Sequence, residues 1–219
     1  MITVIPARGA SKGILRKNLQ RVNGVTLVGR SIRSAQMIPG NSIYLSSDDL
    51  EILDIGKEYD VNSIQRSQLN STDFATSESV LDEVLTYISS DDDLVTLLQP
   101  TSPFIDTNSW LKAIKIMNAD LTIGSIFSAI DKNVSSWQEV DAKWEPINQL
   151  KNVRLPRQLR NKSVVETGSF YLFRQSLFQL EKTRFCGKTL PIISNLWSQF
   201  EIDTIEDLSL CNQIAAIID

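Results

Sequence analysis

Short β-branched runs alternate with longer amphipathic stretches along most of this chain, and this alternation constrains the fold more than any other feature. The short runs predict buried strands, and apolar residues spaced three and four apart predict helices between them. The predicted strands cover residues 2–6, 42–47, 94–100 and 121–129, and the predicted helices cover residues 27–38, 48–59, 77–88 and 107–117. Strands that alternate with helices form a mostly parallel sheet covered by helices on both faces. The chain is therefore predicted to be an α/β protein.

The remaining residues are predicted to belong to the same domain, because no linker, repeat or low-complexity tract divides residues 1–219. A strand at 168–173 and a helix at 204–218 continue the pattern, with Thr204 or Asp203 as the N-cap of that helix. Between residues 130 and 165 the pattern loosens around Trp137 and Trp144. This stretch is interpreted as a surface excursion or a dimerisation arm, and the arm is favoured.

The composition excludes several kinds of site and partner. The chain contains no histidine, which excludes Ser-His-Asp and Cys-His triads and histidine-ligated metals. Cys186 and Cys211 lack CxxC spacing and suggest neither a disulfide framework nor a zinc site. The formal charge of −4 argues against nucleic acid as a partner. No apolar run approaches the ~18 residues of a membrane span, and the N-terminus lacks the basic region of a signal peptide. We therefore expect a cytoplasmic protein without a membrane partner.

Polar segments directly follow three of the predicted strands. They read ARGASKG (7–13), SSDD (46–49) and QPTSP (99–103). In open parallel α/β sheets, ligands bind beyond the carboxyl ends of the strands. The three segments are therefore predicted to lie around one ligand site.

The first of these segments opens a basic stretch in an otherwise acidic chain. Residues 7–21 contain no acidic residue and five basic ones, Arg8, Lys12, Arg16, Lys17 and Arg21. Gly9 and Gly13 allow backbone N–H groups to approach an anion closely, and the basic side chains can grip phosphate oxygens. The stretch matches neither the Walker A pattern nor GxGxxG. It is interpreted as a phosphate site, with a solvated basic face as the alternative.

The stretch IPARGASKGILRKN (5–18) resembles the N-terminal signature of the acylneuraminate cytidylyltransferases, a family whose relatives act on other 2-keto sugar acids. Five further segments follow in the family's order: NGVTLVGRSI (23–32), STDFATS (71–77), LLQPTSP (97–103), ETGSFYLF (166–173) and EIDTIEDL (201–208). The resemblance covers nearly the whole chain and is weakest between residues 130 and 160.

This resemblance implies a Rossmann-like three-layer sandwich of the nucleotide-diphospho-sugar transferase type. It also implies a homodimer and transfer of CMP from CTP to the anomeric hydroxyl of a 2-keto sugar acid, with release of pyrophosphate. The implied cofactor is Mg²⁺, with Mn²⁺ as a substitute. Neuraminic, legionaminic and pseudaminic types all remain candidates for the sugar acid.

Carried over by position, the resemblance also implies the site residues. Arg8, Lys12 and Lys17 would act on the CTP phosphates, and Glu201 and Asp203 would bind the metal. The substrate pocket would be formed by Ala7, Gly9, Asn18, Arg66, Ser77 and Gln99. From the residues alone, Asp203 is equally well explained as a helix cap and Asp73 as a brace of its loop. Glu201 and Asp203, two residues apart on an extended approach, are expected to project to the same side.

Three departures from the family pattern bear on the substrate and the metal. Glu201 stands where the family has aspartate, and its extra methylene allows direct ligation of the metal, ligation through water, or none. Thr167 replaces an asparagine, and Phe104, Ile105 and Asp106 stand where a basic residue often occurs. These last regions are predicted to meet the sugar. Two alternatives stay open: a same-fold nucleotidyltransferase with another nucleotide or sugar, and a catalytically inactive nucleotide-binding protein.

Overall fold

A seven-stranded sheet forms the centre of the computed structural model, which describes residues 1–11, 13–90, 92–132, 135–148, 153, 156–159 and 162–219. Its strand order is β11-β7-β10-β6-β1-β4-β5. The strands are β1 (Ile2–Pro6), β4 (Ser42–Ser47), β5 (Asn62–Gln65), β6 (Leu94–Leu98), β7 (Ile123–Asp131), β10 (Val164–Arg174) and β11 (Lys188–Ile193). Within this sheet β10 runs antiparallel to both β6 and β7, and the other strands share one direction. The predicted α/β class with a mostly parallel sheet is confirmed.

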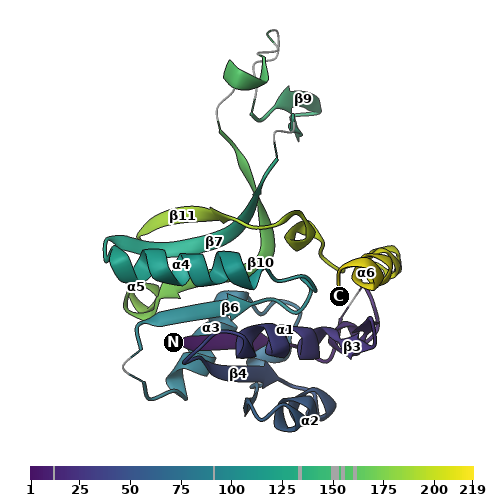
Figure 1. Cartoon of the computed structure of the whole chain (residues 1–219), viewed down its shortest axis with the longest axis vertical. Helices are drawn as coiled ribbons and strands as arrows, with labels where there is room; N and C mark the ends of the chain where they lie inside the picture. The colour runs from purple at the N-terminus through teal and green to yellow at the C-terminus, as the bar shows by residue number, and fades with distance from the viewer. Residues whose placement is uncertain (12, 91, 133–134, 149–152, 154–155, 160–161) are drawn as a thin grey trace.

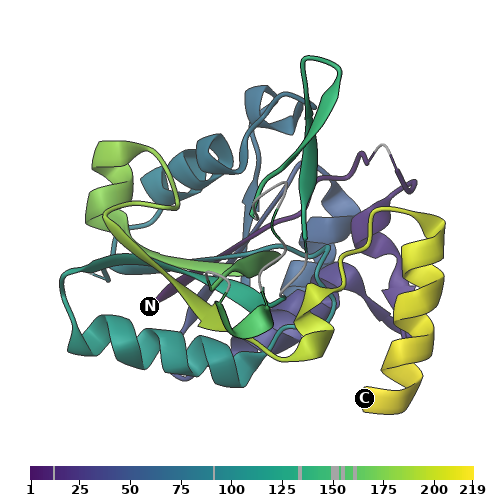
Figure 2. The ribbon, with the colours of Figure 1, turned by 90° about the horizontal axis from the view of Figure 1, so that it is seen from above.

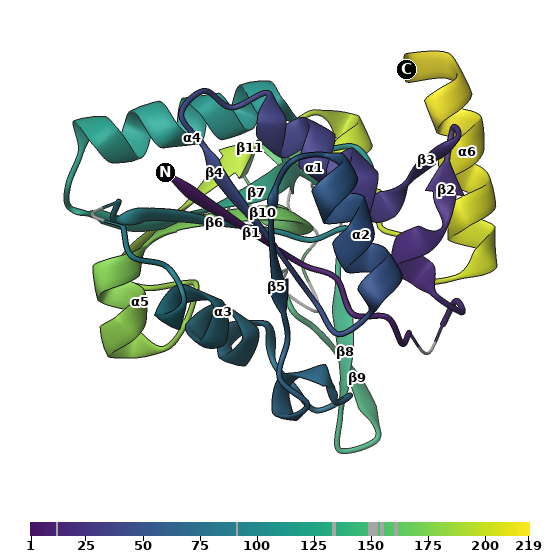
Figure 3. The ribbon, with the colours of Figure 1, turned by 90° about the horizontal axis from the view of Figure 1, so that it is seen from below.

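Helices cover both faces of the sheet, as Figures 2 and 3 show. One face carries α1 (Leu27–Gln36), α2 (Leu50–Glu58) and α4 (Thr107–Ala119), and the other carries α3 (Ser77–Thr86) and α5 (Gln175–Glu181). Successive residues of a strand point to opposite faces. Val4 of β1 accordingly packs in the core beneath α3 and α5, and Ile5 packs in the core beneath α1 and α4. No described helix has the length and apolarity needed to cross a bilayer.

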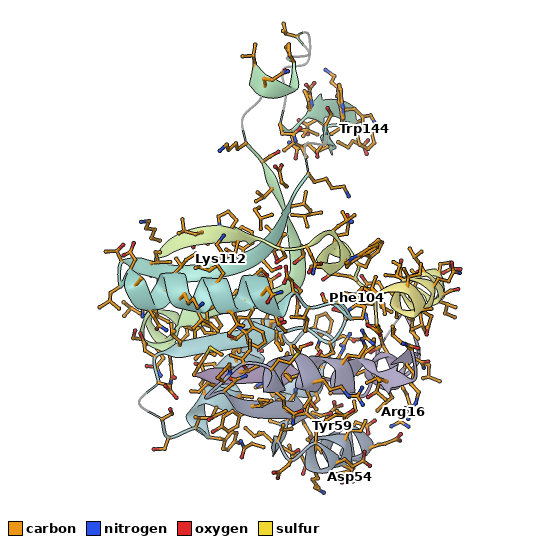
Figure 4. The ribbon with its side chains drawn as sticks, in the orientation of Figure 1. Arg16, Asp54, Tyr59, Phe104, Lys112 and Trp144 are labelled. Atoms are coloured by element: carbon orange, nitrogen blue, oxygen red, sulfur yellow. The ribbon has the colours of Figure 1, made fainter. Side chains whose placement is uncertain are left out.

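A third apolar core joins the two ends of the chain. It packs α6 (Ile205–Ile218) against the small hairpin of β2 (Arg21–Val22) and β3 (Val25–Thr26). Ile14 and Ile202 are buried in this core together with Phe104, which lies beside α6 in Figure 4. Thr204 is the N-cap of α6 and forms a capping box with Asp207. Of the two predicted N-caps, Thr204 is therefore the correct one. The side chain of Asp203 does not cap the helix.

The segment between residues 130 and 165 carries a hairpin that projects from the body of the molecule (Figure 1). The hairpin consists of β8 (Trp137–Val140) and β9 (Lys143–Pro146). Its strands are exposed apart from the last residues of β9. Trp144 is 61% exposed on this projection (Figure 4). β7 and β10 reach further into the segment than the sequence pattern indicated, because both strands continue pairing to Asp131 and Val164.

Sequence reasoning missed two edge strands and one short helix, β5, β11 and α5. β5 contains only four residues, and its side chains are half-buried or exposed, so it lacks a continuous apolar run. β11 contains Pro191, a residue that sheets accept at their edges because its missing N–H removes a ladder hydrogen bond. The hydrophobic pattern is weak in both strands because each lies at an edge of the sheet and pairs with only one neighbouring strand.

Five hydroxyl side chains form a buried cluster beneath an irregular stretch of β10. The pairing of β10 with β7 shifts register between Glu166 and Tyr171. There the hydroxyl of Thr167 lies 2.6 Å from Ser128 Oγ and 2.9 Å from Ser169 Oγ. The cluster comprises Ser109, Ser128, Thr167, Ser169 and Ser194. Because buried hydroxyls need partners, this cluster fixes the irregular part of the strand.

Replacing Thr167 by valine should lower the free energy of unfolding by about 1–3 kcal/mol, because the remaining buried hydroxyls lose a partner. Urea denaturation followed by circular dichroism measures this change. Thr86→Val is the matched control, since Thr86 is exposed on α3 and its hydroxyl bonds only the carbonyl of Glu83. Equal stability of the two variants would contradict a structural role for the cluster.

Candidate functional site

A cleft of about 500 Å³ lies beyond the carboxyl ends of β1 and β6, beside the N-terminus of α3. Its walls come from four segments that are distant in the sequence: the loop after β1, the loop before α3, the residues after β6, and the approach to α6. Of the predicted site residues, Arg8, Lys17, Asn18, Arg66, Ser77, Gln99 and Asp203 line this cleft. Lys12 lies outside the described residues. The location agrees with the ligand position expected for an open α/β sheet.

Ala7 and Gly9 do not line the cleft but hold its basic loop in place. The Ala7 N–H donates to the carbonyl of Ser46 at 2.9 Å and continues the pairing of β1 with β4. The Gly9 N–H, which the sequence assigned to an anion, donates instead to Asp48 Oδ1 at 2.8 Å. A side chain at Gly9 would collide with Asp49, the N-cap of α2. The segment after β4 therefore holds the loop after β1 through hydrogen bonds and does not itself line the cleft.

Two basic side chains reach across the cleft to carboxylates on the facing segments. Arg8 Nη1 lies 2.7 Å from Asp73 Oδ1, and Lys17 Nζ lies 2.8 Å from Asp203 Oδ1. Arg16 instead points toward α2, where it pairs with Asp49 and Glu51. Partly exposed ion pairs of this kind contribute little stability, so Arg8 and Lys17 can exchange their carboxylates for phosphate oxygens at small cost.

Arg66 is the most buried cationic side chain of the cleft, with a residue exposure of 8%. Its Nη2 donates to the carbonyl of Ser46 at 2.9 Å, and it forms no ion pair with any described carboxylate. Burial lowers the pKa of Arg66, while the fields of Asp48 and Glu83 raise it. Even so, arginine stays charged in proteins. A buried charge without a direct counter-ion is costly, and an anionic ligand in the cleft would supply one.

The N-terminus of α3 and a buried amide complete the wall around the basic residues. Thr76 caps α3 through a bond from the Ser79 N–H, and Ser77, the first residue of the helix, lines the cleft. A helix N-terminus carries a partial positive charge that favours anions. Asn18 is buried and donates to the Arg8 carbonyl at 2.8 Å. The amide therefore holds the loop that carries Arg8.

Asp203 lines the cleft, whereas Glu201, two residues before it, does not line it and turns toward a different neighbour. Asp203 lines the cleft beside Lys17. The carboxylate of Glu201 lies against Gly168, where a Cβ would overlap it. Partial burial raises the pKa of Glu201, and the charge of Asp203 raises it further. Two carboxylates close together in the sequence beside a cationic cleft are a donor set that fits Mg²⁺, which usually takes one or two protein carboxylates together with phosphate oxygens and water. Among the described residues no group of three or more potential His, Cys, Asp or Glu ligands is assembled.

The side chains at two of the sequence departures do not line the described cleft, and contact of these regions with the sugar stays a prediction. Thr167 is buried in the hydroxyl cluster, and Phe104 is buried in the third core. Asp106 is the N-cap of α4.

Sequence reasoning also missed Asn70 and Thr101, which line the cleft. Asn70 is buried and donates to Glu83 Oε2 at 2.8 Å, so it supports the loop that carries Asp73. Asp73 itself, which was interpreted as a brace, pairs with Arg8 across the cleft. No sequence signal separates these residues from ordinary loop residues, because their position depends on how two loops meet.

A mostly parallel sheet with a cationic cleft beyond its strand ends is typical of α/β proteins that bind phosphorylated ligands. The sequence model of the cytidylyltransferase family matches residues 2–215. The chain therefore belongs to the cytidylyltransferase family, in agreement with the resemblance seen in its motifs.

Two relatives and two solved structures illustrate these similarities. The chain is 31% identical to N-acylneuraminate cytidylyltransferase A of Danio rerio over 80% of its length, and 26% identical to the N-acylneuraminate cytidylyltransferase of Escherichia coli over 96%. It spans 42% and 51% of these relatives' own lengths. A CMP:2-keto-3-deoxy-manno-octonic acid synthetase complexed with CTP has a TM-score of 0.74 at 16% identity, covering 98% of each chain. A 4-diphosphocytidyl-2C-methyl-D-erythritol synthase from Anaerococcus prevotii has a TM-score of 0.73 at 16% identity, covering 98% of this chain and 95% of that one. These two structures share the fold.

Replacing Arg8 by glutamine should weaken binding of inorganic tripolyphosphate at least about tenfold, since a hydrogen bond to a charged group contributes about 1.5–3 kcal/mol. Isothermal titration calorimetry at fixed ionic strength measures this affinity. Arg21→Gln is the matched control, because Arg21 follows the loop and bonds the carbonyl of Gly24 outside the cleft. Equal losses of tripolyphosphate affinity in both variants would show that the effect depends only on the net charge of the protein.

Proposed function

We propose that this chain transfers CMP from CTP to the anomeric hydroxyl of a nine-carbon 2-keto sugar acid and releases pyrophosphate. The observation that carries the proposal is the meeting of Arg8, Lys17 and Arg66 in one cleft, although they come from separate segments. The similarity to N-acylneuraminate cytidylyltransferases supports a sugar acid of the neuraminic, legionaminic or pseudaminic type as acceptor. A cytoplasmic location is part of the proposal, because the reaction consumes a nucleoside triphosphate.

For this reaction the protein mainly has to position the two substrates and neutralise negative charge, and it needs no covalent intermediate. Attack of a hydroxyl on the α-phosphorus builds negative charge on the departing pyrophosphate, as in phosphoryl transfer generally. Arg8 and Lys17 face the cleft from the loop after β1 and would neutralise that charge. Arg66 and the N-terminus of α3 would hold the nucleotide on the opposite side. The loop is braced by Asp48 and Asn18, so its cations are positioned before substrate binds.

The donor groups of the cleft support Mg²⁺ as the cofactor, with Mn²⁺ as a substitute. Asp203 lines the cleft beside Lys17, at the end where phosphates would lie, and Glu201 stands two residues before it. When bound there, the metal would supply a positive charge between the triphosphate and the carboxylate. Lys17 would then exchange its bond to Asp203 for a phosphate oxygen, which leaves the carboxylate to the metal.

Replacing Asp203 by asparagine should lower turnover about 10²–10³-fold with little change in stability, because Thr204 rather than Asp203 caps α6. Release of pyrophosphate from CTP, ATP and GTP, with a panel of sugar acids, measures this change. Glu206→Gln is the control, since Glu206 is exposed in the first turn of the same helix. EDTA should abolish activity, and Mg²⁺ or Mn²⁺ should restore it.

The same assay separates the proposal from its alternatives. Comparable turnover with a purine triphosphate would indicate a same-fold enzyme with another nucleotide. Nucleotide binding without pyrophosphate release from any pair of substrates would indicate a catalytically inactive nucleotide-binding protein.

The proposal includes a homodimer formed through the arm at residues 130–165. The described part of the arm exposes Trp137, Val140, Trp144 and Ile147 on a narrow hairpin. Exposed apolar residues clustered on a projection are typical of protein interfaces, where aromatic anchors contribute most of the binding energy. A second copy of this chain is the partner that the family resemblance implies.

Replacing Trp144 by glutamate should dissociate this dimer, with a dissociation constant at least about 100-fold higher, because a charge would enter an apolar contact. Sedimentation equilibrium measures the constant. Leu180→Glu is the control, since Leu180 is an exposed apolar residue on α5, outside the arm. A monomeric unsubstituted chain, or equal effects of both changes, would contradict a dimer through the arm.

A further inference from the structure

A short 3-10 helix, η2 (Leu69–Ser71), lies between β5 and α3 and places the amide of Asn70 in the wall of the cleft. Only 9% of Asn70 is exposed, so most of the side chain is enclosed by protein. Its Nδ2 donates to the carbonyl of Ser79 at 3.3 Å and to Glu83 Oε2 at 2.8 Å. Because Ser79 and Glu83 both belong to α3, this helix holds the nitrogen side of the amide.

The two partners of the Asn70 amide prevent it from turning over. A backbone carbonyl and an ionised carboxylate can only accept hydrogen bonds. Partial burial raises the pKa of Glu83, but hydrogen bonds from Asn70 and Ser67 lower it below its usual value, so Glu83 is ionised at neutral pH. Asn70 Oδ1 accepts no hydrogen bond from any described group. This oxygen is therefore the part of the amide that a ligand in the cleft can reach.

Glu83 does not itself line the cleft but acts on this wall through its contacts. Its Oε1 accepts from the Ser67 N–H at 2.9 Å, while its Oε2 accepts from Asn70. Its charge also acts on Arg66. The carboxylate therefore spans the turn from Ser67 to Asn70 and fixes both the backbone and the amide. Glu83 is a positioning residue, because any effect on a ligand passes through Asn70.

The wall around Asn70 combines an acceptor, a donor and apolar contact. Arg66 donates to Ser46 through Nε and Nη2, and its Nη1 bonds no described group. Val80 of α3 and Pro6 of β1 line the same cleft and offer apolar surface. Ligand sites of this kind use apolar contact for most of the ligand and a few placed polar groups for specificity. Cytosine carries an amino donor at the position where uracil carries a carbonyl acceptor, so a fixed acceptor can tell the two bases apart.

We propose that Asn70, oriented by Glu83, accepts a hydrogen bond from the amino group of the cytosine base and thereby selects CTP over UTP. This inference rests on the proposed function, in which CTP is the nucleotide substrate. An oxygen that is fixed toward the ligand repels the carbonyl of uracil. An amide that is free to turn can instead present its NH₂ group to that carbonyl. Releasing the amide is therefore expected to relax the choice between the two pyrimidines.

The test measures binding of CTP, UTP and inorganic tripolyphosphate to the full chain by isothermal titration calorimetry, with Mg²⁺ and without a sugar acid. The unsubstituted chain should bind CTP at least about 100-fold more tightly than UTP, since a site that hydrogen-bonds a group rejects an analogue without it. Glu83→Gln keeps the shape of the side chain, but an amide can donate as well as accept. The ratio of the CTP and UTP affinities should therefore fall at least about tenfold, while tripolyphosphate affinity stays within about threefold.

Asn70→Ala should also lower this ratio, through weaker binding of CTP. Glu58→Gln is the matched control, because it makes the same change of charge at an exposed position of α2 and should leave the ratio unchanged. Circular dichroism checks that each variant is folded.

A ratio that stays at the unsubstituted value in Glu83→Gln and Asn70→Ala would overturn the inference. Equal losses of CTP and UTP affinity in Glu83→Gln would overturn it as well and make Glu83 a purely structural residue. Equal affinity of the unsubstituted chain for CTP and UTP would also overturn it. A preference for CTP without pyrophosphate release from any sugar acid would instead overturn the proposed function.

Discussion

The third apolar core is the constraint on which the candidate site depends, because it ties the start of the chain to its end. Ile14 and Ile202 are buried together in this core, and Gly13 packs so closely on the Asp203 carbonyl that a Cβ there would overlap it. This packing places Lys17 and Asp203, which are 186 residues apart in the sequence, within 2.8 Å of each other. Without it, the basic loop after β1 and the acidic approach to α6 would be separate surfaces.

The three described cationic side chains of the cleft differ in whether they have a carboxylate as counter-ion. Arg8 and Lys17 are held by carboxylates from facing segments, and the buried Arg66 has no direct counter-ion among the described carboxylates. In the proposed function, a polyphosphate bound in the cleft would replace the first two pairs and would provide a counter-ion for Arg66. Because the braces from Asp48 and Asn18 already fix the loop, little conformational entropy is lost when the ligand binds.

The two ends of the site are built from different parts of the fold. The loop after β1, the start of α3 and the approach to α6 line the cleft, whereas Gly168 brings the antiparallel strand β10 against Glu201. β10 and β7 also carry the arm at residues 130–165. The two solved structures with this fold carry names that specify different cytidylylated products.

The sequence by itself determined the α/β class, strands β1, β4, β6 and β7, helices α1 to α4, and the basic loop, since these depend on residue patterns within a few turns of chain. It did not determine the edge strands β5 and β11, whose side chains are only partly buried and carry weak patterns. It also did not reveal that the N–H groups of Ala7 and Gly9 bond the segment after β4, or that Thr167 and Phe104 are buried, because these contacts join separate segments of the chain. Only the tertiary structure decided that Asp203 pairs with Lys17 while Thr204 caps α6, and that Glu201 rests on Gly168. Such contacts join residues far apart in the sequence, and their geometry follows from how the three cores pack together.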